Sequence, residues 1–333
     1  MIYINYFLKL FYTTNSLKFV IILLSINFSI VSISYTQSTF EFLNINENAK
    51  IKALGGTNVS LHTNQNYFIA NPSLLFFSKN KSILINHMKY ILDTNSSSIL
   101  YTDSISQIGK FGLGIKYFSH GKFNGYDVFG NSTGLFHPKE FSINFTKAIK
   151  FSNFIFGTTI KYVNSKIFDI TNDAILIDLG GIYYPNKKKN ITIGINISNF
   201  GFLLSKENIN LPLYIQLGTT FKPKYMPVRF SFTLNKSSIK SSINDIYSNS
   251  FTQFLSHMNV GLEILISKNL NLQLGYNYKI DQEFSLTNNR NNGGLSYGIE
   301  ILLRRFNLNY GRVITNTLNT SNIISLNFNL KRI

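Results

Sequence analysis

Apolar and polar residues alternate along much of the chain, most regularly between Leu270 and Leu330. In the segment that begins at Leu270, one predicted face is apolar and the other polar: Leu272, Leu274, Tyr276 and Tyr278 against Asn271, Gln273, Asn277 and Lys279. A period of two places neighbouring side chains on opposite faces of a strand. Two-faced segments of about ten residues, separated by turns, are typical of strands that cross a membrane.

The same period predicts about 14 strands, an even number as in single-chain bacterial barrels. Their predicted centres are Ile85, Leu100, Ile115, Phe145, Phe156, Leu179, Ile193, Leu217, Phe230, Leu262, Leu274, Ile299, Leu308 and Leu326. The predicted fold class is therefore all-β: a transmembrane antiparallel β-barrel formed by residues 81–333. In this fold the backbone can satisfy its hydrogen bonds within the bilayer.

The links between the predicted strands alternate in length. Short links are predicted at Gln107–Lys110, Lys150–Asn153, Pro185–Asn190, Pro223–Met226, Ser267–Asn269 and Arg304–Arg305. Long links are predicted at Gly121–Pro138, Asn164–Asn172, Asn199–Asn210, Asn235–Leu255, Asp281–Asn292 and Val313–Thr320, and one short link near Asp93 breaks the rule. An up-and-down barrel gathers its short turns at the periplasmic end and its long loops outside.

Two segments precede the predicted barrel. Residues 1–36 contain an apolar stretch from Phe19 to Ile33 followed by small polar residues, which predicts a secretory signal peptide. A retained anchor helix is the alternative. Residues 37–80 lack clean alternation and contain Gly55, Gly56 and an Asn71–Pro72 turn. A barrel of this size has room inside, so we expect this segment to plug the lumen as a hatch. The alternative is an ordered periplasmic extension.

The formal charge of +17 is a reason to consider nucleic-acid binding. The basic residues are scattered along the chain, however, which argues against it. Eight lysines fall at or beside the short links and are expected to ring the periplasmic mouth: Lys110, Lys150, Lys187, Lys188, Lys189, Lys222, Lys224 and Lys268. They could attract an acidic periplasmic partner, although contact with lipid headgroups is the interpretation we favour.

The chain offers little catalytic chemistry. Its five histidines show no metal-ligand spacing, and neighbours such as Ser119 and His120 point to opposite faces of a strand. We therefore predict no enzyme, no catalytic residues, no cofactor and no metal. Several charged residues are expected to face the lumen, where mutual pairing is favoured over a path for solutes: Asp178, Glu263, Glu300, Lys116, Lys161, Arg229 and Lys279.

One predicted loop is rich in apolar residues. The link Asn235–Leu255 contains Ile246, Tyr247, Phe251 and Phe254, and exposed aromatics dominate the energetics of many interfaces. We interpret it as a candidate surface for docking a partner protein; folding over the barrel mouth is equally compatible with its composition.

Several motifs carry a resemblance to a known family. They are Gln37–Phe42 (QSTFEF), Ala53–Gly56 (ALGG), Asn71–Leu75 (NPSLL), Phe111–Tyr117 (FGLGIKY) and Gly121–Phe123 (GKF). The chain resembles PorQ-like members of the PorV/PorQ family, outer-membrane barrels of the type IX secretion system that are related to the FadL fatty-acid transporters. The resemblance implies a barrel of about 14 strands with an N-terminal hatch.

The resemblance also implies a function. Family members of this kind are expected to anchor a peripheral surface protein, a PorZ-like partner, in a complex that attaches secreted cargo to lipopolysaccharide. The expected location is the bacterial outer membrane, with its lipid as surroundings. The alternative is a FadL-like transporter of long-chain fatty acids or other hydrophobic molecules, which requires an apolar pocket inside the barrel. The predicted inward positions are mostly polar, which disfavours it.

Overall fold

The computed structural model describes residues 39–63, 65–90, 93–185, 190–205, 209–237, 250–283, 293–316 and 319–330. The predicted signal peptide lies outside these ranges. The barrel strands are β1 (Ser82–Lys89), β2 (Asn95–Ile105), β3 (Gly109–Ser119), β6 (Lys139–Phe151), β7 (Phe154–Ile167), β8 (Ile170–Tyr183), β9 (Ile191–Leu203), β10 (Tyr214–Phe221), β11 (Val228–Ser237), β12 (Met258–Leu265), β13 (Leu270–Asn277), β14 (Leu295–Leu302), β15 (Phe306–Ile314) and β16 (Thr320–Asn329).

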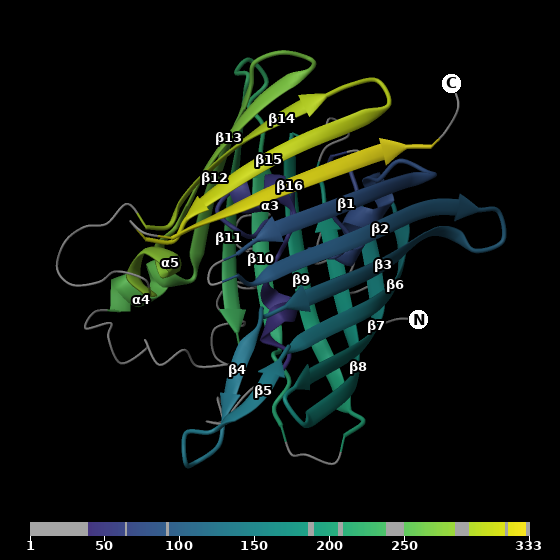
Figure 1. Ribbon diagram of the computed structural model, residues 1–333. Coiled ribbons are helices and arrows are strands. Elements are labelled where there is room, and N and C mark those ends of the chain that lie inside the picture. Colours follow the sequence, from purple (N-terminus) through teal and green to yellow (C-terminus); the bar gives the residue numbers. More distant parts are fainter. Residues whose placement is uncertain are drawn as a thin grey trace. The chain divides into compact units, whose positions relative to one another are not determined.

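These strands form one closed antiparallel barrel (Figure 1). Each strand pairs with its neighbours in sequence, except that β3 pairs with β6, because β4 (Phe123–Tyr126) and β5 (Ser132–Phe136) form a separate hairpin between them. Closure is made by β1 and β16, from the pair Ser82 and Asn329 to the pair Lys89 and Asn322. Every strand centre predicted from the alternation lies in a barrel strand, so the predicted fold class is confirmed.

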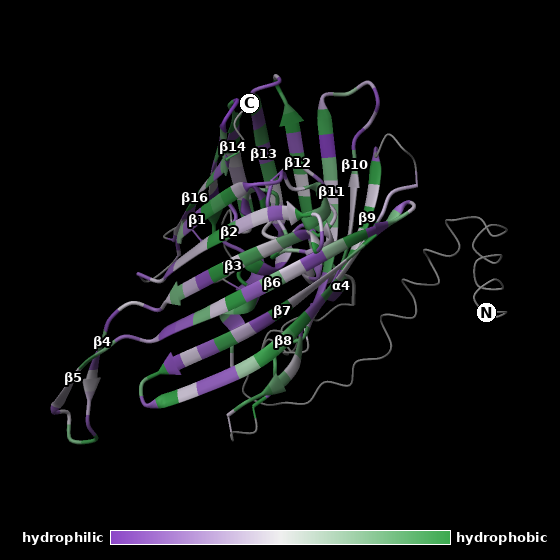
Figure 2. Cartoon of the chain, turned by 90° about the vertical axis from the view of Figure 1, so that its right-hand side faces the viewer, coloured by the Kyte–Doolittle hydropathy of each residue, from purple (hydrophilic) through white to green (hydrophobic). Residues whose placement is uncertain are grey.

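Hydrophobic and hydrophilic residues alternate along the strands (Figure 2), and this alternation puts opposite chemistry on the two faces of the wall. Large apolar side chains are exposed on the outside, among them Ile85, Ile99, Ile115, Phe145, Phe156, Leu179, Leu274 and Ile324. The side chains facing the lumen are mostly polar and buried, among them Asn86, Ser98, Thr146, Asn196, Gln273 and Ser325. An apolar exterior and a fully paired backbone are what a lipid bilayer demands of a barrel. None of the described helices is long and apolar enough to cross a membrane.

Several links differ from their predicted bounds. The segment 164–172 is not a loop, because β7 and β8 continue to a tight turn at Phe168 and Asp169. Likewise β9 continues past Asn199 to Leu203, after a β-bulge opposite Asp178. These strands were underestimated because their outer ends carry Asn and Asp, residues that also favour turns.

The segments after β11 and β13 hold two short helices. Helix α4 (Ser250–Ser256) precedes β12, and α5 (Tyr278–Glu283) follows β13. The prediction that Tyr278 and Lys279 belong to a strand was therefore wrong. Lys279 instead forms an i,i+4 ion pair with Glu283 at 3.4 Å on α5. The alternation that looked continuous in sequence ends at Asn277, whose side-chain oxygen accepts a hydrogen bond from the amide of Ile280.

The residues ahead of β1, which we call the hatch (39–63 and 65–81), lie against the inner wall of the barrel (Figure 1). They form η1 (Glu41–Asn44), α3 (Ala49–Ala53) and η2 (Pro72–Phe77). The side chain of Asn48 caps α3 by accepting from the amide of Ile51, and Asn71 caps η2 by accepting from that of Ser73. Helix α3 packs on β13 to β16, whereas η2 packs on β3, β6, β7 and β8.

Candidate functional site

Glycines on the lumen face of the wall mark where the hatch backbone touches the barrel. A Cβ atom on Gly157 would lie 2.3 Å from the carbonyl carbon of Pro72, and one on Gly194 would lie 2.3 Å from the Val59 oxygen. One on Gly311 would lie 2.5 Å from the oxygen of Ala49. Distances this short exclude any side chain, so the wall is shaped for this hatch.

Gly55, Gly56, Asn71 and Pro72, the residues singled out in the sequence, all lie at this interface. Gly55 has φ +95°, and a Cβ there would lie 2.9 Å from the Val260 oxygen, so the position favours glycine. Gly56 shares this conformation. The Asn71 amide nitrogen donates to the carbonyl oxygens of Val59 (2.8 Å) and Ile195 (3.2 Å). Asn71 therefore ties two hatch segments to β9, beside Pro72.

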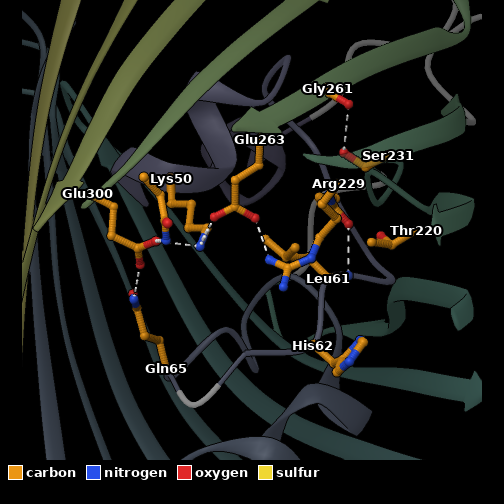
Figure 3. Close-up of polar contacts among 12 residues, drawn as sticks. Lys50, Leu61, His62, Gln65, Thr220, Arg229, Ser231, Gly261, Glu263 and Glu300 are labelled. Carbon is orange, nitrogen blue, oxygen red and sulfur yellow. Dashed lines mark hydrogen bonds and ion pairs between the residues drawn. The ribbon is translucent and has the colours of Figure 1, made fainter. Parts of the chain in front are cut away.

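Four charged residues form a buried network between α3 and the wall (Figure 3). The ammonium of Lys50 lies 2.5 Å from a carboxylate oxygen of Glu263 and 2.7 Å from one of Glu300. Arg229 pairs with the other oxygen of Glu263. Two positive and two negative charges balance, and Gln65 of the hatch also donates to Glu300. We call Lys50, Arg229, Glu263 and Glu300 the latch, because they join the hatch, through Lys50, to the barrel wall.

Electrostatics explains why Lys50 stays charged although it is buried. Burial alone would lower the pKa of Lys50, but Glu263 and Glu300 outweigh it and hold that pKa above its ordinary value. Lys52 on the same helix forms no ion pair within the described residues, and the attraction of Glu47 does not outweigh its burial. Burial, with repulsion from Lys116, lowers the pKa of Lys52 to about 8.

Two further ion pairs lie elsewhere in the lumen, one between the wall and the hatch and one within the wall. Lys116 on β3 lies 3.0 Å from Glu47 of the hatch and donates to the Phe42 oxygen at 2.9 Å. Lys161 on β7 pairs with Asp178 on β8 at 2.6 Å. The predicted pairing of lumen charges is therefore seen for Asp178, Glu263, Glu300, Lys116, Lys161 and Arg229. Lys279, on α5, is the exception.

Two cavities inside the described part of the barrel bear on transport: the smaller has a mixed lining of apolar and polar side chains, and the larger is mostly polar. One on the long-loop side, beside Lys161, Asn196 and Tyr214, measures about 40 Å³, which is room for little more than water. A larger one of about 670 Å³ lies at the short-turn end and is lined largely by charged and amide side chains. Neither cavity is the apolar pocket that a carrier of fatty acids would need.

Among the described residues, the hairpin of β4 and β5 carries the most exposed apolar side chains on the long-loop side (Figure 2). Its base is fixed by Phe136, whose ring packs against Phe123 and Phe168, each with centroids 5.5 Å apart. At its tip the side chains of Val128 and Phe129 are 94% and 86% exposed. The hairpin was not predicted, because four- and five-residue strands in a long polar link give too short a pattern.

An ordered turn presents this tip. The carboxylate of Asp127 accepts from the amides of Phe129 (2.9 Å) and Asn131 (2.8 Å). Hydrogen bonds from the side chain and backbone of Asn131 lower the pKa of Asp127. The turn therefore keeps its charged acceptor in mildly acidic conditions, and the two apolar side chains remain displayed.

The docking loop predicted from the sequence is only partly described. Ile246 and Tyr247 lie outside the described residues, and for Phe251 the structure gives the backbone of α4 alone. Phe254 is 40% exposed on α4, and its carbonyl accepts from the His257 amide. Its role in docking stays a prediction.

The described residues contain no cluster of three or more metal-ligating side chains. His120 contacts Glu140 at 2.9 Å, and the Ser119 hydroxyl accepts from the amide of Gly121.

The hatch members of the ion pairs, Lys50 and Glu47, were missed in the sequence. Nothing in an irregular segment signals that a lysine will meet carboxylates more than 200 residues away.

Comparison with solved structures supports the fold. The deltaS2 mutant of the monoaromatic hydrocarbon channel TodX matches with a TM-score of 0.54 and 14% identity, over 87% of this chain and 100% of that one. The monoaromatic hydrocarbon channel CymD matches with a TM-score of 0.50 and 10% identity, over 88% and 100%. A FadL homologue from Pseudomonas aeruginosa matches with 8% identity and a TM-score of 0.47, over 90% and 100%, too distant to argue from.

No protein-family model matches the chain. No curated protein matches it either. At these identities the likeness to TodX and CymD establishes a shared barrel fold and nothing finer. Together with the apolar exterior, this fold makes the protein an integral barrel of the bacterial outer membrane.

Proposed function

We propose that this protein is a closed outer-membrane barrel that anchors a peripheral protein at the cell surface, as a component of the type IX secretion system. The observation that carries the proposal is the hatch held across the lumen. The hatch is held by the latch, by Lys116 and Glu47, and by backbone contacts at glycines. A hatch held in this way closes the lumen as a path and favours a role at the surface of the barrel.

The hairpin of β4 and β5 is the element best suited to hold a partner. Its tip displays Val128 and Phe129 on an ordered turn, so binding would cost little conformational entropy. Apolar and aromatic anchors of this kind supply most of the energy of an interface. The partner that the sequence resemblance implies is a PorZ-like surface protein, in a complex that contacts lipopolysaccharide.

Replacing Val128 and Phe129 by serine should lower recovery of the partner by at least about tenfold, which corresponds to about 1.4 kcal/mol. The measurement is copurification with the tagged protein from native outer membranes. The matched control replaces Tyr225 and Met226, two exposed residues in the turn between β10 and β11 at the opposite end. Equal recovery with both double variants would show that the tip is not the docking site.

A second candidate function is a channel for hydrophobic molecules. One observation favours it: TodX and CymD, which share this fold, are hydrocarbon channels. The polar lining of the larger cavity, the small volume of the other and the buried ion pairs argue against it, since a hydrophobic solute needs an apolar pocket. Accumulation of toluene in cells that carry the protein, above that in cells that lack it, would favour the channel over the anchor.

A further inference from the structure

The larger cavity opens at the short-turn end of the barrel, which faces the periplasm in this fold. We call it the vestibule. Its wall comes from three places: Lys79 of the hatch, Lys268 in the turn between β12 and β13, and Arg304 in the turn between β14 and β15. Its floor includes Lys50 and Arg229 of the latch (Figure 3).

The vestibule carries an excess of positive charge. The cations of the floor are balanced by Glu263 and Glu300. Lys79, Lys268 and Arg304 form no ion pair within the described part of the chain, and Glu300 is the only carboxylate in the lining. Three positive charges thus surround a water-accessible volume of about 670 Å³, a size typical of ligand sites.

Lipid headgroups do not account for these cations. A lysine on the outer rim can reach the headgroups of the surrounding bilayer, but Lys79, Lys268 and Arg304 line the inside of the mouth. Their counter-charge must come from the aqueous periplasm. Lys268 was grouped with the rim lysines in the sequence, but its place in the vestibule lining separates it from them. For the remaining rim lysines, headgroup contact is still the simpler interpretation.

The surroundings favour an extended anion over a single small one. The short turns contribute Lys222, Lys224 and Arg305 around the mouth, and the residues of these turns include no aspartate or glutamate. A basic field of this extent attracts a chain of negative charges and raises its association rate. Within the vestibule, Arg304 can bind a carboxylate through two parallel hydrogen bonds.

We propose that the vestibule binds the carboxylates of an acidic polypeptide segment from the periplasm. The site is distinct from the hairpin, at the opposite end of the barrel, and does not depend on surface anchoring. It gives the protein a contact with the periplasm as well as one outside the cell.

The test uses the full mature protein in nanodiscs of zwitterionic lipid, with fluorescein-labelled hexaglutamate as the probe and anisotropy as the readout. We expect saturable binding of hexaglutamate, none of hexaglutamine, and at least about tenfold weaker binding when salt rises from about 50 to about 500 mM. Inorganic phosphate at the same concentration as the peptide should not displace it. Absence of saturable binding, or displacement by phosphate, would overturn the proposal.

A pair of charge-matched variants locates the site. Lys79→Gln/Lys268→Gln/Arg304→Gln should weaken hexaglutamate binding by about tenfold or more, whereas Lys222→Gln/Lys224→Gln/Arg305→Gln should change it less than about threefold. Both remove three charges, so an equal loss would mean that only net charge matters. Heat-modifiable gel migration verifies that each variant is folded.

Two further arms decide between a vestibule site and its competitors. Charge reversal with Lys79→Glu/Lys268→Glu/Arg304→Glu should transfer binding to hexalysine, a gain that a misfolded barrel could not produce. Nanodiscs rich in phosphatidylglycerol should leave hexaglutamate binding intact. If that lipid abolishes it, headgroups occupy the vestibule and the proposal fails.

Discussion

Replacing Lys50 with methionine should release the hatch and make the purified barrel conduct ions. The change leaves the buried carboxylates of Glu263 and Glu300 with Arg229 as their single counter-charge. Removing one partner of a buried ion pair costs about 3–5 kcal/mol. We expect the change to weaken the binding of the hatch to the wall and to leave the barrel folded, because the strands are held by their own hydrogen bonds. Current steps across planar bilayers provide the measurement.

Two variants make this result specific. Adding Glu300→Gln to Lys50→Met restores the charge balance, so most of the closure should return. Lys52→Met alters the same helix but removes a lysine that forms no ion pair with the barrel wall in the described part of the chain, and should leave the barrel without current steps. If Lys50→Met is as silent as Lys52→Met, the latch does not hold the hatch.

Replacing Gly180 with leucine should displace η2 from the wall. A Cβ at Gly180 would lie 2.0 Å from Oδ1 of Asn71, the atom that caps η2, and 2.9 Å from Cδ of Pro72. The clash and the lost cap together should cost about 3 kcal/mol. Because the chain contains no cysteine, Ser60→Cys in the buried hatch supplies a unique label site. Maleimide labelling there should become about a hundredfold faster.

The neighbouring residue is the matched control. Gly181 faces outward, and a Cβ there would meet only a methyl group of Ile195, at 3.0 Å. Gly181→Leu therefore adds an apolar side chain on the lipid side, and labelling of Ser60→Cys should stay slow. Similar labelling in the two variants would contradict the close fit between the lumen glycines and the hatch.

The barrel could be predicted from sequence because the bilayer imposes a simple rule on it. Each strand must place apolar residues outward and polar ones inward. The alternation alone therefore predicts that Leu274 faces the lipid and Gln273 the lumen, as the structure has them. The links were harder. Phe168 and Asp169 form a two-residue turn where a loop was predicted, since the residues beyond the hydrocarbon no longer need to alternate.

The hatch contacts obey no such rule. Lys50 meets Glu263 and Glu300, and Asn71 meets Ile195, across long stretches of chain that only the closed barrel brings together. The glycines carried part of the signal. Glycine inside a strand allows close packing, and the structure places Phe68 against Gly112 and Asn71 against Gly180. Which groups they would meet depends on how the hatch folds, and its sequence has no period to indicate this.

The most direct test of the closed lumen is the conductance of the unaltered protein. Purified wild-type barrel, inserted in a planar bilayer at neutral pH, should give no current steps, while a variant that lacks residues 39–80 should give large and stable ones. Wild-type steps as large as those of the deletion variant would contradict the account, because the lumen would then be open with its hatch in place.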